Sequence, residues 1–438
     1  MSSATIKNPE IECMRRAEIE QLQLERLQAT MNRAYRNVAF YHKRFEQLGI
    51  TPEDIQSRED LKRLPLTEKN DLSVGYPYGM FAVPLREVVR IHMSAGTTGH
   101  PSVVAYTAND LRHWTDLVAR NLTAAGVTKN DVVQILYGYG LFTAGFGYHY
   151  GTEAIGASVI PVSTGDTRRQ AEVMRDFRTT VIIGTPYYAL RIADTVEEMG
   201  IGPNELSLRI GLFGDEAWSE PVREEIERRL YIKAFDIYGL AEIGGPGVSF
   251  ECEERAGLHV AEDQFLVEVI NPETGEVLGP GVEGELVFST VNKEAFPLLR
   301  YRSGDLSSIN LEPCRCGRTH ARMGRVSRHT DNRIVVRGTN ILPAQVEAAL
   351  GELSGLGPGH QIVVDRSTAL ERLEVHVELA PESMPDQMGR LVQLESRVKQ
   401  KLQDSLGLPV EVKLVEPAAI PEGAPRVRVV EKGEKRVS

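Results

Sequence analysis

Two glycines and three hydroxyl residues lie within residues 93–101, where the chain reads MSAGTTGHP. Backbone N–H groups can converge in such a loop because glycine carries no Cβ, and hydroxyl groups donate to phosphate oxygens. No lysine follows in the Walker spacing, so the loop is not a P-loop. The segment favours a phosphate cradle, and a plain hairpin turn is the alternative that it leaves open. The cradle residues are Ser94, Gly96, Thr97, Thr98 and Gly99.

Aromatic residues alternate with glycines over residues 137–142, which read YGYGLF, and Gly145 and Gly147 follow closely. Aromatic side chains offer edge and face contacts to a flat ring, and glycines let the backbone approach it. The pattern predicts a pocket for an aryl acid. The alternative is that the aromatic cluster belongs to the core.

The chain has four cysteines, and Cys314 and Cys316 lie two residues apart in the turn CRCG. Cys252 and His259 are seven residues apart (259 − 252 = 7). Two sulfurs from one turn, with Cys and His from a second element, match a closed tetrahedral Zn²⁺ site. Four protein ligands leave no open position, so such a site would be structural. Unpaired buried residues are the alternative, and a disulfide framework is not expected from so few cysteines.

The candidate residues lie in or beside a region in which short apolar runs alternate with helical stretches such as 220–230. Short buried strands that alternate with helices predict an α/β domain with a largely parallel sheet covered on both faces. The runs are 132–136, 158–162, 181–183, 210–213 and 235–237.

Different patterns lie on either side of this region. Leu24, Leu27, Met31, Ala34 and Val38 recur at three- and four-residue spacing, which predicts an amphipathic N-terminal helix. After residue 265, period-two patterning with glycine-rich turns predicts an antiparallel, barrel-like appendage.

The C-terminal region follows a strand, helix, strand order that predicts a small α+β domain with a hinge over residues 325–331. The expected domains are 1–326, with a helical module at 1–75, and 327–438. The tail from Arg426 holds five basic and two acidic residues, and we expect it to be mobile.

Composition narrows the class of protein. The 438 residues are 42% hydrophobic and 25% charged, as in ordinary globular chains. Lys and Arg number 50 against 61 Asp and Glu, so the net charge of −11 argues against a nucleic-acid or anionic-membrane binder. The N-terminus has no secretory pattern and no transmembrane stretch is apparent, so we expect a cytoplasmic protein.

Three further blocks follow the glycine-rich loop: FDIYGLAE (235–242), YRSGDL (301–306) and a stretch opening with Gly324-Arg325. Together the four blocks resemble the adenylate-forming (acyl-CoA synthetase) superfamily. YGYGLFTAGFGYHYG and YGLAEIGGPGVSFEC are similar to its phenylacetate-CoA ligase branch, and the resemblance extends nearly end to end. It implies the adenylate-forming fold, with a large domain and a small C-terminal lid. The implied reaction joins an aryl acid to CoA through an acyl-adenylate, with ATP and Mg²⁺.

The resemblance also implies roles for single residues. Glu242 would hold Mg²⁺, and Asp305 and Arg325 would bind the ribose. A surface position for Glu242, and helix-capping roles for Asp215 and Asp236, are the alternatives. The adenine would be lined by Gly214, Asp215, Glu216, Asp236, Tyr238 and Gly239, and the aryl ring by Tyr137, Phe142, Gly214 and Ile237.

The sequence departs from the family pattern at two cationic positions. His100 stands where a lysine is usual, and the catalytic lysine of the lid is replaced by Pro425, with Arg426 adjacent. We expect Lys69 to compensate in part, with Arg426 as the weaker candidate. Gly338 would lie near the CoA channel.

Other functions stay open at this point. The acyl group could pass to a carrier protein or an amine in place of CoA. Without the lid lysine, the chain could instead be a non-catalytic binder of acyl-CoA or nucleotide. The branch resemblance also makes a homodimer reasonable.

Overall fold

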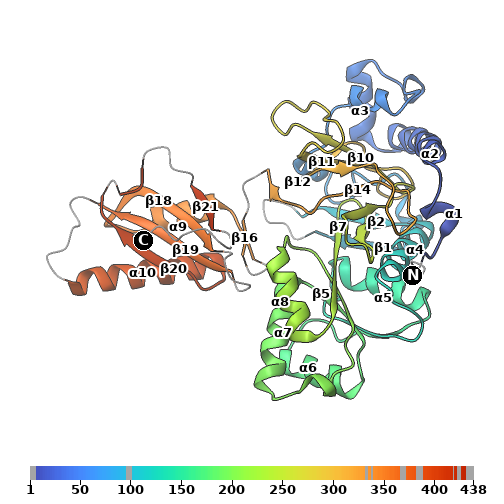
Figure 1. Cartoon of the computed structure of the whole chain (residues 1–438). Helices are drawn as coiled ribbons and strands as arrows, with labels where there is room; N and C mark the ends of the chain where they lie inside the picture. The colour runs from blue at the N-terminus through green and yellow to red at the C-terminus, as the bar shows by residue number, and fades with distance from the viewer. Residues whose placement is uncertain are drawn as a thin grey trace. The chain divides into compact units, whose positions relative to one another are not determined.

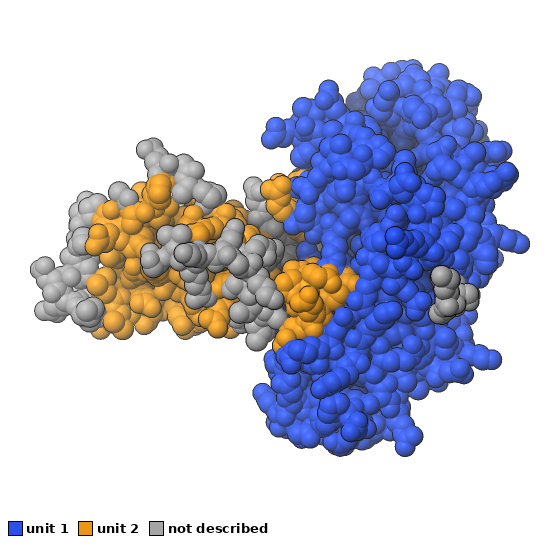
Figure 2. Space-filling model, in the orientation of Figure 1, with its two compact units in different colours: residues 1–217, 226–327 blue, residues 218–225, 328–438 orange. Residues whose placement is uncertain are grey.

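The structure is a computed structural model that describes residues 6–94, 101–330, 334–336, 339–365, 371–380, 388–417, 419–421 and 426–430. Two compact units make up the chain (Figure 2). Unit 1 comprises residues 1–217 and 226–327, and unit 2 comprises residues 218–225 and 328–438.

The largest sheet of unit 1 has the strand order β13-β14-β9-β8-β7-β6-β5-β3-β4 in the described part of the chain. The pairs β3–β4, β3–β5, β5–β6 and β6–β7 are parallel, and the sheet turns antiparallel at β7–β8. The predicted parallel strands are therefore confirmed, but the sheet is mixed, because β8, β9, β14 and β13 extend it in antiparallel order. Its parallel strands are β3 (Val132–Ile135), β4 (Ser158–Ile160), β5 (Val181–Gly184), β6 (Ile210–Phe213) and β7 (Lys233–Leu240). Its antiparallel strands are β8 (Gly245–Glu251), β9 (Leu258–Val260), β13 (Ile309–Asn310) and β14 (Arg322–Met323).

Two groups of helices belong to this sheet region (Figure 1). α4 (Ala108–Ala124) and α5 (Ala144–Ala154) pack on each other and on β8, whereas α6 (Thr167–Asp176) and α7 (Pro186–Glu198) form a second pair. α4 begins with a capping box, in which Thr107 N–H donates to Asp110 and Asp110 N–H donates back to the Thr107 hydroxyl. α8 (Glu220–Leu230) covers the predicted helical stretch.

The N-terminal segment is helical, as its periodicity predicts. α1 (Pro9–Glu12), α2 (Arg16–Asn37) and α3 (Ala39–Leu48) precede the sheets. α2 buries Leu27, Met31 and Ala34, and its buried Gln23 amide donates to the carbonyls of Glu262 and Phe265. These bonds attach the helix to the start of the antiparallel sheet.

The antiparallel region contains β10 (Phe265–Ile270), β11 (Gly284–Thr290) and β12 (Tyr301–Ser307), which pair in that order. Thr67 forms a parallel bridge to Tyr301, and its N–H donates to the Arg300 carbonyl at 2.8 Å. The Thr67 hydroxyl also donates to the Leu299 carbonyl at 2.7 Å. The polypeptide just before Lys69 is thus anchored beside β12. A separate hairpin pairs β1 (Arg90–Met93) with β2 (Val103–Tyr106).

Unit 2 is built on a sheet of order β20-β19-β18-β21, and α9 and α10 contribute buried residues to its core. Val346, Ile362, Val375 and Leu402 lie at the centre of that core. The bounds are β15 (Arg328–His329), β16 (Ile334–Val336), β17 (Thr339–Ile341), α9 (Pro343–Gly351), β18 (Leu356–Asp365), β19 (Arg372–Leu379), α10 (Met388–Leu406), β20 (Glu411–Val415) and β21 (Val427–Val430).

One expectation for this region was wrong for residues 427–430, whereas residues 431–438 lie outside the described residues. The tail that we expected to be mobile from Arg426 contains β21, which pairs in parallel with β18 from Ile362 to Asp365. Three valines in VRVV supply the β propensity, which outweighs the basic composition at this position. Within the described residues, no helix combines the length and apolarity needed to cross a membrane.

Candidate active site and metal centre

A partly open pocket lies where parallel strands of the large sheet end. Tyr137 follows β3, Asp215 follows β6, and Ile237 lies in β7. In open α/β sheets, ligands bind beyond the carboxyl ends of the strands, because the loops there diverge. The lining residues are Tyr137, Phe142, Thr143, Ala144, Tyr148, Asp215, Ile237, Tyr238, Gly239, Ala241, Gly245 and Pro246.

Two stacked tyrosines form part of this pocket. The rings of Tyr137 and Tyr148 lie 6.0 Å apart with an angle of 12° between their planes. The Tyr137 hydroxyl lies 2.8 Å from the Gly184 carbonyl and 3.2 Å from that of Gly214, so its ring is held in place. The structure thus brings the predicted ring residues Tyr137, Phe142 and Ile237 together.

Gly214 lies behind the pocket rather than in its lining. A Cβ at this position would meet the Ile237 carbonyl oxygen at 2.3 Å, so the close approach of the two strand ends requires glycine. The next residue, Asp215, has φ +73°, a left-handed conformation that Asp tolerates better than most residues.

Glu242 lies beyond the end of β7, beside a lysine from the N-terminal module. The Nζ atom of Lys69 is 3.9 Å from Oε1 of Glu242, whose side chain is 8% exposed. Lys69 lies in a 3-10 helix over Lys69–Ser73, two residues after the Thr67 bridge to β12. The structure therefore brings together the predicted magnesium ligand and the predicted compensating cation.

Asp305 on β12 is buried and accepts a hydrogen bond of 2.6 Å from the Tyr238 hydroxyl. Burial and the neighbouring Asp305 carboxylate raise the pKa of Tyr238 well above its usual range, so Tyr238 acts as a donor. Arg325 pairs with Asp236, at 3.4 Å between Nε and Oδ2, and its Nη2 atom lies 3.9 Å from Oε1 of Glu251. Glu216 accepts a bond from the Tyr187 N–H at the start of α7.

The described residues at the ends of the predicted phosphate loop are joined by hydrogen bonds. Ser94 N–H donates to the Ser102 carbonyl at 3.0 Å, and Ser102 N–H donates to the Ser94 hydroxyl at 3.1 Å. The predicted residues Gly96, Thr97, Thr98 and Gly99 lie outside the described residues, as does His100.

A buried cation that the sequence analysis missed lies near this site. The Nζ atom of Lys293 is 4.2 Å from the centre of the Tyr106 ring and makes no hydrogen bond with a described residue. Burial lowers the pKa of Lys293 to about 8, although the carboxylates of Asp110 and Glu242 act in the opposite direction.

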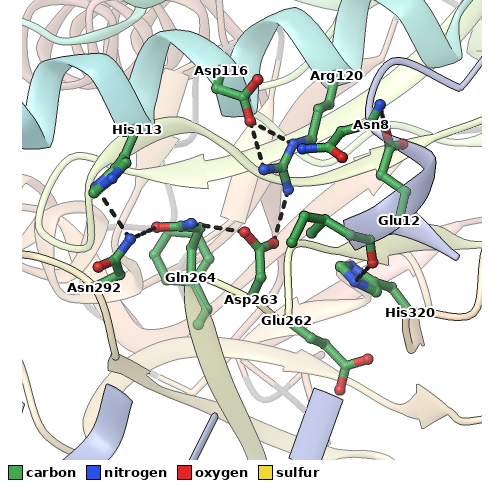
Figure 3. Close-up of polar contacts among 12 residues, drawn as sticks. Asn8, Glu12, His113, Asp116, Arg120, Glu262, Asp263, Gln264, Asn292 and His320 are labelled. Carbon is green, nitrogen blue, oxygen red and sulfur yellow. Dashed lines mark hydrogen bonds and ion pairs between the residues drawn. The ribbon is translucent and has the colours of Figure 1, made fainter. Parts of the chain in front are cut away.

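A polar network holds the backbone around Lys293. Asn292 donates to Gln264 at 3.0 Å and lies 3.1 Å from His113, and Gln264 donates to Asp263 at 2.7 Å (Figure 3). Arg120 completes the series, because it pairs with both Asp263 and Asp116. On the other side of Lys293, the N–H groups of Glu294 and Ala295 donate to Asp110.

Two further predicted positions belong to unit 2. Arg426 lies 3.5 Å from Oε1 of Glu347 in α9 and 3.3 Å from Nε2 of His360 in β18. Gly338 and Pro425 lie outside the described residues.

The four predicted metal ligands form a cluster in unit 1. The ligand atoms of Cys252, His259, Cys314 and Cys316 all lie within 4.8 Å of one another, and all four residues are buried. The sulfurs of Cys252 and Cys314 are 3.8 Å apart, and Nε2 of His259 is 3.4 Å and 3.5 Å from the sulfurs of Cys252 and Cys316. A tetrahedral zinc with ordinary bond lengths has S···S edges of about 3.8 Å and S···N edges of about 3.5 Å. The donor set and spacing therefore fit Zn²⁺.

A cation lies against this cluster. The buried guanidinium of Arg318 donates to the Cys316 sulfur at 3.6 Å and to Glu12 of α1 at 2.6 Å. Three thiolates and one neutral histidine around a divalent ion carry a net charge of −1, which Arg318 would offset. The neighbouring Cys252 thiol and His259 ring lower the pKa of Cys316.

Comparisons with known proteins decide the family. Residues 21–292 match the model of the AMP-binding enzyme family, and residues 338–432 match that of the AMP-binding enzyme C-terminal domain. The chain is 44% identical to a phenylacetate-coenzyme A ligase of Thermus thermophilus, over 97% of this chain and 98% of that protein. It is 45% identical to a phenylacetate-coenzyme A ligase of Pseudomonas putida, over 90% of each chain.

The chain belongs to the AMP-binding enzyme family. A crystal structure of 2-hydroxyisobutyryl-CoA ligase in complex with 2-HIB-AMP and CoA is similar to this AMP-binding enzyme, with a TM-score of 0.82 and 26% identity. That similarity covers 99% of this chain and 94% of the ligase. The adenylate-forming fold that the motifs predicted is confirmed.

Several residues of this AMP-binding enzyme's site escaped sequence reasoning. Tyr148 lies in the same aromatic run as Tyr137, but it belongs to helix α5. Its position in the sequence therefore gives little indication that it lines the pocket. Lys293 and Arg318 are single basic residues with no motif of their own, and only their surroundings distinguish them. The apolar residues Val291, Ala295 and Phe296 in the segment VNKEAF are a weak signal that could have indicated burial of Lys293.

Proposed function

We propose that this chain is an AMP-forming ligase that joins an aryl carboxylic acid to CoA. The observation that carries the proposal is the position of an aromatic pocket beside the Glu242–Lys69 pair. Ala241 lines that pocket and Glu242 follows it directly, so the acid pocket and the charged groups adjoin. The near full-length similarity to phenylacetate-coenzyme A ligases supports CoA as the acceptor.

The first half-reaction would join the acid to AMP. A carboxylate oxygen of the substrate attacks the α-phosphorus of ATP, the bond from that phosphorus to the bridging oxygen breaks, and pyrophosphate leaves. Negative charge grows on the departing phosphates, and cations in a water-poor site stabilise it far more than they would in water. The Lys69 ammonium would contact these phosphates, and Asp305, held by Tyr238, would accept hydrogen bonds from the ribose hydroxyls.

Glu242 would hold Mg²⁺, because a nearly buried carboxylate is a hard oxygen ligand suited to that ion. The ion would neutralise phosphate charge. Adenine would lie near Asp236 and the segment that follows β6.

The second half-reaction would form the thioester. The CoA sulfur attacks the carbonyl carbon of the acyl-adenylate, the bond from that carbon to the phosphate oxygen breaks, AMP leaves, and the thiol proton is released. The small C-terminal domain of such enzymes is expected to change position between the two steps. The homodimer expected from the resemblance stays a prediction.

The test is AMP formation from ATP with a panel of aryl acids, each assayed with and without CoA. We expect AMP only when both an acid and CoA are present. The Glu242→Gln variant should lose at least about 100-fold in rate, because it removes a carboxylate ligand. AMP formation with an amine or carrier protein in place of CoA would identify a different acceptor, and no AMP with any acid would indicate a non-catalytic binder.

We also propose that the Cys252, His259, Cys314 and Cys316 cluster holds a structural Zn²⁺. Its distances match the edges of a zinc tetrahedron, and four protein ligands leave no position for a substrate. Elemental analysis should find about one zinc per chain. Metal-free protein with full activity and unchanged stability would refute the assignment.

A further inference from the structure

The polar groups in the lining of the aromatic pocket are the hydroxyls of Tyr137, Thr143, Tyr148 and Tyr238 and one carboxyl group. The Tyr137 hydroxyl faces two backbone carbonyls, and the Tyr238 hydroxyl donates to Asp305. Among the described residues that line the pocket, Asp215 brings the one carboxyl group.

The Asp215 carboxyl has no hydrogen-bond donor in the described part of the chain, and no cation is paired with it. Its side chain is reached by solvent, yet the protein around it raises its pKa to about 6 by desolvation. The group therefore lines the pocket, is reached by solvent and is mostly ionised at neutral pH.

The position of this carboxylate relative to the two tyrosines follows from its electrostatic effect. After burial, Asp215 is the largest cause that raises the pKa of both Tyr137 and Tyr148. A charge that acts on both stacked rings lies close to the part of the pocket that an aryl ring would occupy. Asp215 lies two residues after β6, with a φ of +73°.

An aryl acid that fills the pocket would displace the water around Asp215. An ionised carboxylate that loses its water and gains no donor carries a large desolvation cost. A ligand that brings an O–H or N–H group to the carboxylate avoids that cost and forms a charge-assisted hydrogen bond.

We propose that Asp215 selects aryl acids that carry a hydrogen-bond donor on the ring, a hydroxyl or an amino group. This inference rests on the proposed aryl-CoA ligase function and specifies its substrate class. The exocyclic amine of adenine offers the same donor chemistry, so the experiment must separate the two sources. We favour the ring substituent because Asp215 lines the pocket together with Tyr137, Phe142 and Tyr148.

The test measures acid binding by titration calorimetry and kcat/KM in the ATP- and CoA-dependent reaction. The acids are phenylacetate, the 2-, 3- and 4-hydroxyphenylacetates, 4-aminophenylacetate and 4-methoxyphenylacetate. The methoxy acid is a matched control, because it keeps the ring oxygen but lacks the donor.

The variants follow from the backbone. Asp215→Gly removes the carboxylate and suits a positive φ, whereas Ala would add strain there. Asp215→Asn keeps the shape and one neutral acceptor. Asp54→Asn, in the N-terminal module, is the control for a general effect of losing an Asp, and a melting curve checks that each variant folds.

We expect the best donor-bearing acid to exceed phenylacetate and the methoxy acid by about 10- to 100-fold, the range of a hydrogen bond to a charged group. Asp215→Gly should abolish that preference and improve phenylacetate, Asp215→Asn should be intermediate, and Asp54→Asn should match the wild type.

Two results would overturn the inference. One is an order of preference among the acids, in binding and in kcat/KM, that is the same in Asp215→Gly as in the wild type. The other is a rise in the KM for ATP in Asp215→Gly that is equal for all acids, which would assign the carboxylate to adenine. Binding is measured without turnover, so the two proposals can fail separately. If the chain binds donor-bearing acids more tightly but forms no AMP, the ligase proposal is refuted and the inference about Asp215 stands.

Discussion

At the scale of single residues, the site contains a buried lysine whose charge lowers the stability of the fold. Lys293 is only 9% exposed and lies among Tyr106, Phe296 and the α4 cap residue Asp110, which already accepts backbone N–H bonds. A lysine buried without a hydrogen bond destabilises the native state in its charged form. We therefore expect Lys293, which feels the charge of Glu242, to contribute to function rather than to stability.

Lys293→Met should therefore raise the melting temperature at pH 7. The pKa falls from 10.5 in the unfolded chain to about 8 in the folded one, a difference of about 3 kcal/mol against folding below pH 8. The unfolded state binds the proton more tightly between these values, so wild-type stability recovers as pH rises from 8 to 10.5. Thermal unfolding at pH 7 and pH 10 should show the advantage of the variant shrinking, and a lower melting temperature for Lys293→Met at both pH values would contradict this view.

Tyr238→Phe should raise the KM for ATP by about tenfold and change kcat little. The substitution removes a 2.6 Å bond to the buried Asp305 and leaves that carboxylate less well held for the ribose. The measurement is ATP-dependent pyrophosphate exchange. Phe235→Leu, in the same strand but away from Asp305, controls for lost aromatic packing, and an unchanged KM in Tyr238→Phe would exclude the ribose role.

At the scale of elements, the metal cluster lies among neighbouring strands of the large sheet, in which β9 pairs with both β8 and β14, and β14 pairs with β13. Cys252 follows β8 and His259 lies in β9, whereas Cys314 and Cys316 lie in the loop between β13 and β14. Arg318 extends the connection to Glu12 of α1. A bound ion would therefore hold three parts of unit 1 together.

Cys316→Ser should lose the zinc and lower the melting temperature by roughly 5–10 °C, because a structural metal site contributes several kcal/mol. Metal content and unfolding should be measured on the same preparation. Cys13→Ser is the matched control, because Cys13 is a cysteine outside the four-ligand cluster. Equal zinc content in both variants would show that Cys316 is not a ligand.

At the scale of the whole molecule, the chain consists of two units, and the predicted cations are divided between them. Lys69 lies in unit 1 beside Glu242, and Arg426 lies in unit 2 near Glu347 and His360. A cation held in the same unit as the phosphate site stays in place whatever position the lid takes.

Lys69→Ala should accordingly lower acid-dependent pyrophosphate release by about 100-fold, and Arg426→Ala by about tenfold or less. The double variant shows whether the two cations act on the same step, because independent effects would multiply. Lys62→Ala, on the N-terminal module, is the control. Undiminished rates in both single variants would refute the compensation hypothesis.

Local patterns predicted those parts of the molecule in which neighbours along the chain decide the structure. The α2 periodicity and the β3, β5 and β6 apolar runs are of this kind, because burial follows directly from their period. β18 and β21 were missed, because a mixed segment such as LGPGHQIVVD and a basic tail become strands only through pairing with each other and with β19.

The sequence by itself determined the motifs, the four metal ligands and the aromatic run, because each depends on residue type and spacing. Only the tertiary structure decided that Lys69 meets Glu242, that Tyr238 holds Asp305, and that Asp215 lines the aromatic pocket with no hydrogen-bond donor among the described residues. These relations join residues up to 173 positions apart (242 − 69 = 173). They depend on strand order and on the Thr67 bridge, which no local pattern specifies.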